Sequence, residues 1–163
     1  MLKDYHFKIL DSTSIYLKKN YKEYDNMSFV STDYQINGHG RNNKKWFSSD
    51  GENLLFSVLI KEKDLIEKYS SISLYSACCI YKVLNDLNLK NVSIKWPNDV
   101  YVNDKKISGI LLEGISFNNK IEAIIIGVGI NVNVIEFDEE IKDIATSIKL
   151  EIKKKIDIEE LKN

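Results

Sequence analysis

The segment from Ile94 to Glu113 constrains the fold most, because two tight turns within it make short strands follow one another. Pro97, the only proline of the chain, favours extended geometry in the residue before it, and Asn98-Asp99 supplies the first turn. A short apolar strand, Val100–Val102, leads to a second turn at Asn103-Asp104. The segment therefore predicts neighbouring strands of one sheet.

The strand that returns after the second turn carries a lysine whose side is set by the period-two alternation of strands. Strict alternation places Lys106 on one face with Ser108, Ile110 and Leu112, and it places on the other face Ile107, Gly109, Leu111 and Glu113. Lys106 then shares a face with apolar residues. Two interpretations are open: its ammonium group extends to water at the strand end, or it reaches a buried anion.

Length and composition predict one globular domain. The chain has 163 residues, of which 44% are hydrophobic, so it can bury a core of its own. A formal charge of -1 gives no overall attraction to nucleic acid or acidic lipid. No apolar run is long enough to span a bilayer, and the adjacent Cys78 and Cys79 cannot bridge each other. We expect a cytoplasmic protein with no nucleic-acid or membrane partner.

Polar residues follow the first predicted strand, His6–Leu10. The run Asp11–Ser14 offers several helix N-cap candidates, and capping is the simplest role for Ser12 and Thr13. A second strand is predicted for Phe29–Ile36, where Gln35 has the position of a solvated strand end.

The middle of the chain predicts a central strand and a helix that packs on the sheet. Residues Leu54–Ile60 are almost continuously apolar, and Asp64 can cap the segment that follows. The helix has an apolar stripe formed by Leu74, Ala77, Cys78, Tyr81, Leu84 and Leu87.

The loop Asn37–Ser49 has the composition of an anion site. Its central run, Gly38–Trp46, has three fixed positive charges, and no acidic residue lies between Asp33 and Asp50. Arg41 is the only arginine among 23 basic residues, which indicates a need for its planar, multi-donor fork. A flexible basic loop with one arbitrary arginine is an equally good interpretation of this loop alone.

The strand Ile121–Val134 has two unlike faces. One is apolar throughout, and the other carries Ile125, Gly127, Gly129, Asn131 and Asn133. The alternate glycines leave a floor without side chains, on which a flat ligand can lie or against which a helix can pack closely. The remainder, 136–163, reads as charged loop and helix.

Four motifs, in this order, resemble those of the biotin protein ligases. The run Lys95–Asp99, followed by Lys105–Glu113, is similar to the signature of that family. Gly38–Trp46 resembles its glycine- and arginine-rich biotin loop, and Leu10–Thr13 and Gly127–Asn131 resemble two further motifs. The resemblance covers almost the whole chain and is to the monofunctional type, which has no DNA-binding domain.

The resemblance implies a fold of the α+β class: a mixed β-sheet backed by helices, like the catalytic core of biotin ligases and of class II aminoacyl-tRNA synthetases. It implies that residues 1–163 form one catalytic domain. We expect no N-terminal winged helix before the first motif and therefore no operator binding, and we expect the small C-terminal β-barrel domain of many relatives to be absent from this chain.

The activity implied is that of an ATP-dependent ligase. Biotin and ATP, with Mg²⁺, would give biotinyl-5′-AMP, and a lysine of a biotin carboxyl carrier protein would then accept the biotinyl group. Family members often form homodimers through an edge strand. Two alternatives stay open: a lipoate- or octanoate-ligase-like acyltransferase, and a truncated biotin-binding protein without catalysis.

The resemblance also implies roles for individual residues. Arg41 and Lys106 would be catalytic. The biotin-binding residues would be Ser12, Thr13, Ser14, Gln35, Gly38, His39, Gly40, Arg41, Lys106 and Gly109. ATP and the adenylate would be held by Arg41, Trp46, Lys95, Asn98, Asp99 and Asn131, with Asp99 as the candidate Mg²⁺ ligand.

The biotin loop departs from the family at three positions. The family usually has arginine where this chain has His39 and glycine where it has Asn43, and arginine is common at Lys44. We therefore expect this loop to become ordered in a different way or to hold biotin less tightly, although an imidazole can still donate a hydrogen bond.

Overall fold

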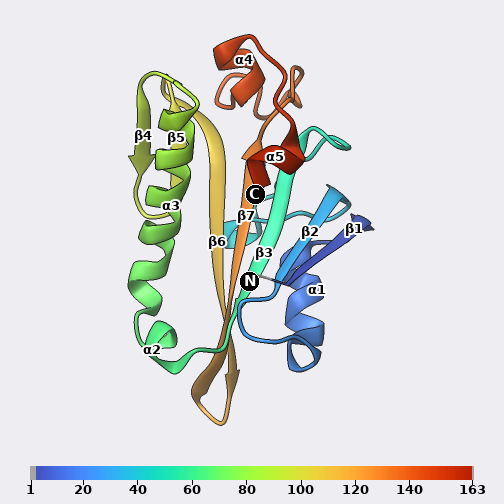
Figure 1. Cartoon of the computed structure of the whole chain (residues 1–163), viewed down its shortest axis with the longest axis vertical. Coiled ribbons are helices and arrows are strands. Elements are labelled where there is room, and N and C mark those ends of the chain that lie inside the picture. Colours follow the sequence, from blue (N-terminus) through green and yellow to red (C-terminus); the bar gives the residue numbers. More distant parts are fainter. Residues whose placement is uncertain (1–2, 163) are drawn as a thin grey trace.

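A computed structural model describes residues 3–162, and its central feature is one seven-stranded sheet (Figure 1). The strands are β1 (Asp4–Leu10), β2 (Phe29–Gln35), β3 (Asn53–Ile60), β4 (Val92–Lys95), β5 (Asp99–Val102), β6 (Lys105–Phe117) and β7 (Lys120–Asn131). Their order is β1-β2-β3-β7-β6-β5-β4. Strands β1 and β2 are parallel, and the other neighbouring pairs are antiparallel. The predicted mixed sheet is confirmed.

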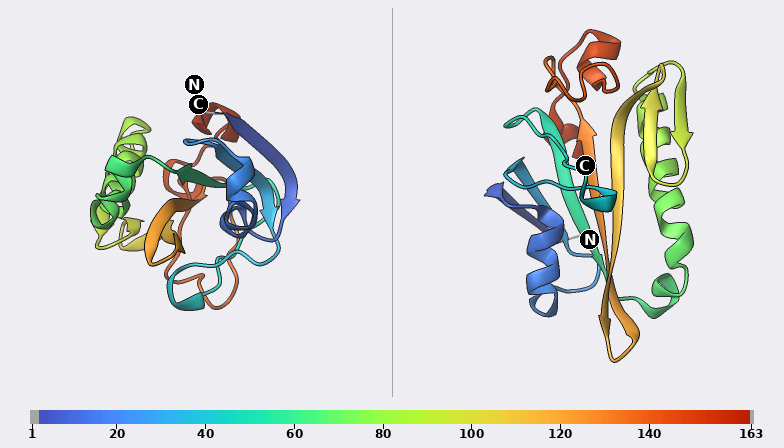
Figure 2. Two further views of the ribbon diagram at one scale, coloured as in Figure 1. Left: turned by 90° about the horizontal axis from the view of Figure 1, so that it is seen from below. Right: turned by 180° about the vertical axis from the view of Figure 1, so that it is seen from behind.

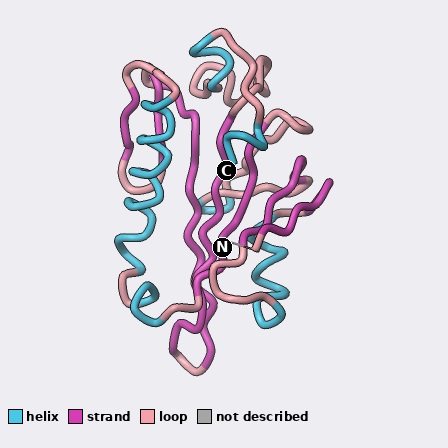
Figure 3. Tube along the Cα trace, viewed as in Figure 1, coloured by secondary structure: helices cyan, strands magenta, loops and turns pink. Residues whose placement is uncertain are grey.

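Helices lie outside the sheet (Figure 3). They are α1 (Thr13–Asn20), α2 (Lys63–Ile66), α3 (Tyr69–Asp86), α4 (Ile148–Ile152) and α5 (Ile158–Lys162), with 3₁₀ turns η1 (Tyr21–Glu23) and η2 (Arg41–Asn43). The short α1 and the long α3 lie on opposite sides of the sheet (Figure 2). Within residues 3–162, no helix has both the length and the apolar character needed to cross a membrane.

The two faces of β7 serve different parts of the molecule. Val128 and Ile130 pack in the main core against α3, whereas Ile125 packs with Leu17 of α1. The predicted alternation along this strand is confirmed. Its consequence is that the glycines of β7 lie on the face covered by α1.

Helix α3 uses a different buried row from the one predicted. Ala77 and Leu84 are buried as expected, but Leu74 is 44% exposed and Tyr81 is 39% exposed. Apolar residues follow two rows along this helix, and the sheet covers the row that contains Ile72, Ala77, Ile80 and Leu84. The small side chain of Ala77 lets the helix approach the strands closely. Cys78 and Cys79 are exposed and unbridged.

Strand β6 departs from strict alternation beside Lys106. The pairing with β5 passes from Val100–Ser108 to Tyr101–Lys106, so Ile107 is an extra residue. Such a bulge changes which side chains share a face. Ile107 and Ile110 both pack in the core, and the predicted face of Lys106 is therefore wrong. Its ammonium group lies on the face of Gly109, within 3.1 Å of where a Cβ of Gly109 would be.

The helix cap predicted at Asp64 is also wrong. Helix α2 begins at Lys63, so Glu62 holds the N-cap position and Asp64 lies in the first turn. A carboxylate in the first turn still interacts favourably with the helix dipole, which explains the acidic residue there.

Candidate functional site

Most residues predicted for the site line one cavity of about 460 Å³. It lies on the α1 side of the sheet, between the start of α1, the loop that carries η2, and strands β6 and β7. The predicted residues that line it are Ser12, Thr13, Gln35, His39, Gly40, Arg41, Trp46, Asn98, Asp99, Lys106, Gly109 and Asn131. The fold thus brings together residues from all four motifs.

Three predicted residues lie just outside the cavity wall. The Ser14 hydroxyl is buried and lies 2.9 Å from that of Ser57. Gly38 packs so closely that an added Cβ would lie 2.9 Å from the side-chain nitrogen of Gln35. The Lys95 ammonium lies 5.0 Å from the centre of the Tyr101 ring. These three residues therefore pack against the residues that form the wall and do not line the cavity themselves.

One end of the cavity is polar and uncharged. The Thr13 backbone N–H and hydroxyl both donate to the Gln35 side-chain oxygen, at 2.8 and 3.2 Å. The Thr13 hydroxyl also lies 2.7 Å from that of Ser57. Gln35 therefore accepts hydrogen bonds inside the protein and is not simply a solvated residue at the end of a strand. Ser12 occupies the N-cap position of α1 without a side-chain cap bond, and Thr13 is the first helical residue, so the predicted capping by Ser12 and Thr13 is wrong.

The other end carries the two predicted catalytic cations. The Lys106 ammonium lies 2.7 Å from an Asp99 carboxylate oxygen, and Arg41 donates to the Asn98 side-chain oxygen at 3.2 Å. Asn98 in turn donates to Asp99 and to the Ile110 carbonyl. Arg41 and Lys106 thus meet at two adjacent residues, although one comes from the loop that carries η2 and the other from β6.

The balance of charge in this cavity favours an anion. Asp99 is the one acidic residue among the described lining residues, and the fixed cations that line it are Arg41, Lys44, Lys45 and Lys106. Cations in a concave, partly dry surface attract anions more strongly than the same charges in water.

The predicted glycine floor of β7 is present, but both of its glycines are covered: Ser14 of α1 packs against Gly127, and the Trp46 indole packs against Gly129. Gly109 and Gly129 face each other across β6 and β7. A Cβ on Gly129 would lie 2.5 Å from ring carbons of Trp46, and one on Gly109 would lie 3.0 Å from that ring. The Trp46 ring nitrogen is buried and makes no hydrogen bond within the described protein. Such an unpartnered donor favours a ligand that can accept its hydrogen bond.

Asn131 lines the cavity, but its own amide is already engaged. Its oxygen accepts from Asn53 at 3.0 Å, and its nitrogen donates to the Thr146 carbonyl at 3.0 Å. Asn131 therefore fixes the segment 141–146 against the sheet.

That segment is the main part of the site that the sequence did not reveal. Ile141, Ile144 and Ala145 line the cavity, and the Lys106 N–H donates to the Ile144 carbonyl at 2.8 Å. The pairing joins residues far apart in sequence, and the segment itself reads as charged loop. Phe47 and Tyr101 also line the cavity and were not predicted; the position of Phe47 beside Trp46 is the signal that could have indicated it.

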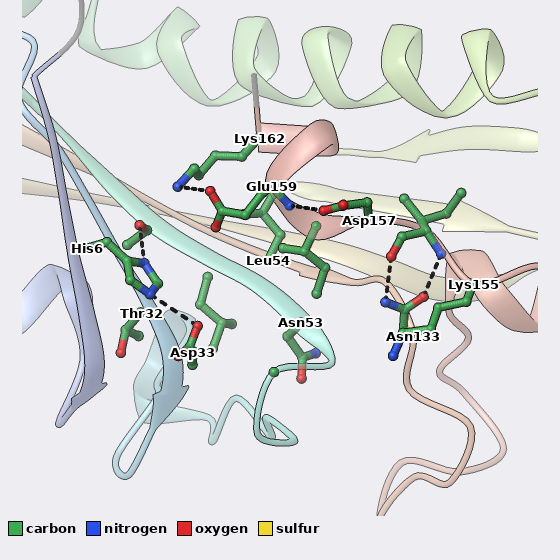
Figure 4. A pocket seen from close by; sticks show the side chains of 15 residues that line it. His6, Thr32, Asp33, Asn53, Leu54, Asn133, Lys155, Asp157, Glu159 and Lys162 are labelled. Carbon is green, nitrogen blue, oxygen red and sulfur yellow. Dashed lines mark hydrogen bonds and ion pairs between the residues drawn. The ribbon is translucent and has the colours of Figure 1, made fainter.

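A second cavity, of about 490 Å³, lies on the opposite face of the sheet, beneath α5 (Figure 4). The His6 ring bridges Asp33 and the Ser31 hydroxyl, at 3.2 and 3.0 Å. Burial opposes the charge of Lys162, but hydrogen bonds to Glu159 and Asp4 outweigh it and raise its pKa above the usual value. These pairs hold α5 to the sheet, and none of the residues predicted for the site lines this cavity.

The fold and the first cavity define a class of protein. Residues 6–131 match the model of the biotin/lipoate A/B protein ligase family, and the chain belongs to that family. The resemblance expected from the four motifs is thus confirmed.

Individual relatives are biotin ligases. The bifunctional ligase/repressor BirA of Bacillus subtilis (strain 168) is 34% identical over 132 residues, which are 80% of this chain and 41% of that protein. The biotin–[acetyl-CoA-carboxylase] ligase of Paracoccus denitrificans is 28% identical over 123 residues, 74% of this chain and 51% of its own length.

The fold is also that of solved biotin protein ligases. The ligase of Aquifex aeolicus, solved in complex with biotin and ATP, superposes with a TM-score of 0.79 at 33% identity. The superposition covers 99% of this chain and 66% of that one. This chain therefore spans only part of the length of the relatives that it matches.

Proposed function

We propose that the cavity activates biotin with ATP and that the chain transfers the biotinyl group to a lysine of a biotin carboxyl carrier protein. The observation that carries the proposal is the division of one cavity into two ends. A neutral hydroxyl and amide network lies at one end, and Arg41 and Lys106 converge at the other. The first suits an uncharged heterocycle, and the second suits carboxylate and phosphate groups.

The first step requires cations at the point where two anions meet. An oxygen of the biotin carboxylate attacks the α-phosphorus of ATP, a new P–O bond forms, and the bond to the β-phosphate oxygen breaks as pyrophosphate leaves. Arg41 and Lys106 would offset the repulsion between the reactants and stabilise the charge that develops on the phosphate. Positioning would supply much of the remaining acceleration.

The second step transfers the biotinyl group. The carrier lysine, as the neutral amine, attacks the acyl carbon, the bond from that carbon to the phosphate oxygen breaks, and AMP leaves as the nitrogen loses a proton. The loop that carries Arg41 and Trp46 would exclude water from the mixed anhydride until the lysine arrives.

The residue roles follow the two ends of the cavity. Ser12, Thr13, Gln35 and the loop backbone would hold biotin, with Gly109 leaving room and Ser14 and Gly38 supporting that end. Trp46, Asn98 and Asp99 would contact the adenylate. Lys95 and Asn131 would act through their neighbours. The Lys95 ammonium lies over the Tyr101 ring, and the Asn131 amide already makes hydrogen bonds within the protein.

Mg²⁺ would enter with ATP. The described residues contain no cluster of three or more metal-ligating side chains, and one Asp99 carboxylate oxygen is held by Lys106. Magnesium is commonly held by substrate phosphates with one or two protein carboxylates. Asp99 fits that pattern as the single protein ligand, and chelation of Mg²⁺ with EDTA should abolish activity.

The decisive experiment is biotin-dependent exchange of labelled pyrophosphate into ATP. We expect exchange by the parent chain and losses of about a hundredfold or more in Arg41→Ala and Lys106→Ala, because each removes a charge from the reacting end. Lys105→Ala is the matched control: Lys105 is exposed, precedes Lys106 and does not line the cavity, so its exchange should equal that of the parent.

The same assay distinguishes the alternatives. Exchange that depends on lipoate or octanoate in place of biotin would indicate the acyltransferase alternative. Biotin binding without exchange would indicate a binding protein, and the proposed activity would then be wrong. Transfer to purified carrier protein tests the second step separately.

A further inference from the structure

The two cations at the reacting end of the cavity have partners of different charge. Arg41 donates a hydrogen bond to the side-chain oxygen of Asn98, a neutral group, at 3.2 Å. The Lys106 ammonium instead lies 2.7 Å from a carboxylate oxygen of Asp99. Asp99 is the one acidic residue among the described residues that line this cavity. A carboxylate of the protein therefore occupies the ammonium that the proposed function requires beside the carboxylate of biotin.

This ion pair is held in place by its neighbours. The same Asp99 oxygen accepts a hydrogen bond from the Asn98 side-chain nitrogen at 3.2 Å, and that nitrogen also donates to the Ile110 carbonyl at 2.9 Å. The Lys106 ammonium lies 5.7 Å from the centre of the Trp46 ring. The side chains of Lys106 and Asp99 are 32% and 22% exposed. Water therefore screens this pair less than it screens a pair on the open surface.

A ligand carboxylate can approach this pair in one of two ways. It can displace Asp99, and the existing ion pair is then lost as the new one forms. It can also share the ammonium, which has more than one N–H donor, but the two carboxylates are then brought close together. Like charges repel each other more strongly in a partly dry cavity than in water. In both cases Asp99 reduces the free energy that is gained when a carboxylate binds to Lys106.

We propose that Asp99 competes with the carboxylate of biotin for Lys106 and so lowers the affinity of the cavity for biotin in the absence of ATP. This inference rests on the proposed function of the cavity. The competition concerns one group of the ligand, because the rest of biotin carries no charge. An analogue of biotin without the carboxylate is therefore not subject to it.

The test is the dissociation constant, measured by calorimetry without ATP, for biotin and for biotinol, in which an alcohol replaces the carboxylate. We expect Asp99→Asn to bind biotin about fivefold more tightly than the parent, the size of effect given by one partly exposed ion pair. It should bind biotinol with the affinity of the parent, because biotinol brings no charge to Lys106. Asparagine keeps an oxygen that can accept the hydrogen bond from Asn98.

Asp104→Asn is the matched control. Asp104 is exposed in the turn between β5 and β6 and does not line the cavity, and the substitution removes the same charge from the chain. Both of its dissociation constants should equal those of the parent. Lys106→Ala should bind biotin more weakly and biotinol as the parent does, because the ammonium recognises only the charged ligand.

The exchange assay gives a readout of opposite direction. Asp99→Asn should exchange pyrophosphate more slowly than the parent although it binds biotin more tightly, because the proposed function assigns Asp99 a contact with the adenylate. A general loss of structure would instead weaken biotin binding and slow exchange together, and that result would contradict the competition.

Two further results would overturn the inference. One is a biotin affinity of Asp99→Asn that equals that of the parent. The other is an equal gain for biotin and biotinol, which would indicate a change in the shape of the cavity and not in its charge. Both leave the proposed function intact, because biotin still binds. No binding of biotin by the parent would instead contradict the proposed function itself.

Discussion

At the scale of single residues, two glycines determine how close an aromatic ring can come to the sheet. Gly109 and Gly129 pair across neighbouring strands, and Trp46 fills the space that a Cβ of either would need. Close backbone approach is the usual reason for a glycine inside a strand. The absence of a side chain at these two positions therefore determines the position of Trp46 as much as the loop that carries it.

Gly129→Ala tests this arrangement. The added methyl group would lie 2.5 Å from the indole, so Trp46 must move outward, and we expect exchange activity to fall about tenfold or more as the loop is displaced. Fluorescence of Trp46, in a Trp96→Phe background, should shift toward that of an exposed indole.

The control for that variant is Gly114→Ala, in the neighbouring strand β6. A Cβ there would meet its neighbours at 3.8 Å, an ordinary contact distance, so neither fluorescence nor exchange should change. Equal behaviour of the two variants would contradict the role assigned to the glycine floor.

Residue types predicted which side chains line the cavity, but they did not predict every orientation. The sole arginine, the basic loop and the alternate glycines all indicated an anion site, and the cavity unites them. The predicted strand face of Lys106 was wrong because Ile107 forms a bulge, and strand periodicity does not indicate an extra residue. The engagement of Asn131 depends on Thr146, a partner that only the folded chain brings near.

At the scale of elements, the sequence predicted which segments form strands and helices better than it predicted their faces and distant pairings. β7 alternates as expected because both of its faces are buried by different helices. α3 has two apolar rows, so periodicity alone could not select the buried one. Segment 141–146 pairs with the start of β6 through backbone atoms. Because backbone donors and acceptors do not depend on residue type, the sequence does not indicate this pairing.

The attachment of α1 to the sheet should weaken in alkali. Tyr24 is half-buried, its ring lies edge-on to Tyr5, and its hydroxyl lies 2.8 Å from that of Tyr16. Burial, followed by the hydrogen bond with Tyr16, raises the pKa of Tyr24 well above its usual value. The unfolded chain would ionise near pH 10 while the folded protein would not, so ionisation favours unfolding.

We therefore expect the contribution of Tyr24 to the free energy of unfolding to be constant below about pH 10 and to fall above it. Urea denaturation followed by circular dichroism measures this free energy at each pH. Tyr24→Phe should show a smaller fall. Tyr75→Phe is the control, because Tyr75 is 68% exposed and should leave the slope of the parent unchanged. An identical slope in Tyr24→Phe would show that other groups cause the alkaline loss.

At the scale of the whole molecule, the sheet separates two environments. The face covered by α1 holds the cavity with Arg41 and Lys106, and the face beneath α5 holds a cavity whose described charges are largely matched by neighbours. Fold and family were predictable because four motifs occur in order and because their strands are strongly apolar. The paired charges beneath α5 have no local signature in sequence.

The sheet also has an edge that is available for association. Strand β1 lies at one end of the strand order, and Ile9 on it is 56% exposed. We propose that the chain forms a homodimer through this edge, and that Ile9→Lys shifts sedimentation equilibrium toward the monomer, because lysine opposes edge pairing. Lys8→Arg keeps the edge charge and should behave as the parent. A parent that sediments as a monomer at every concentration would contradict the proposal.

The contact between Asp4 and Lys162, at 2.9 Å, joins the first described strand to the last described helix (Figure 1). Both residues lie on the α5 side of the sheet, away from the mouth of the cavity that contains Trp46. An affinity tag or surface linker attached near either residue would therefore immobilise the protein with the mouth of that cavity turned outward, toward the solution.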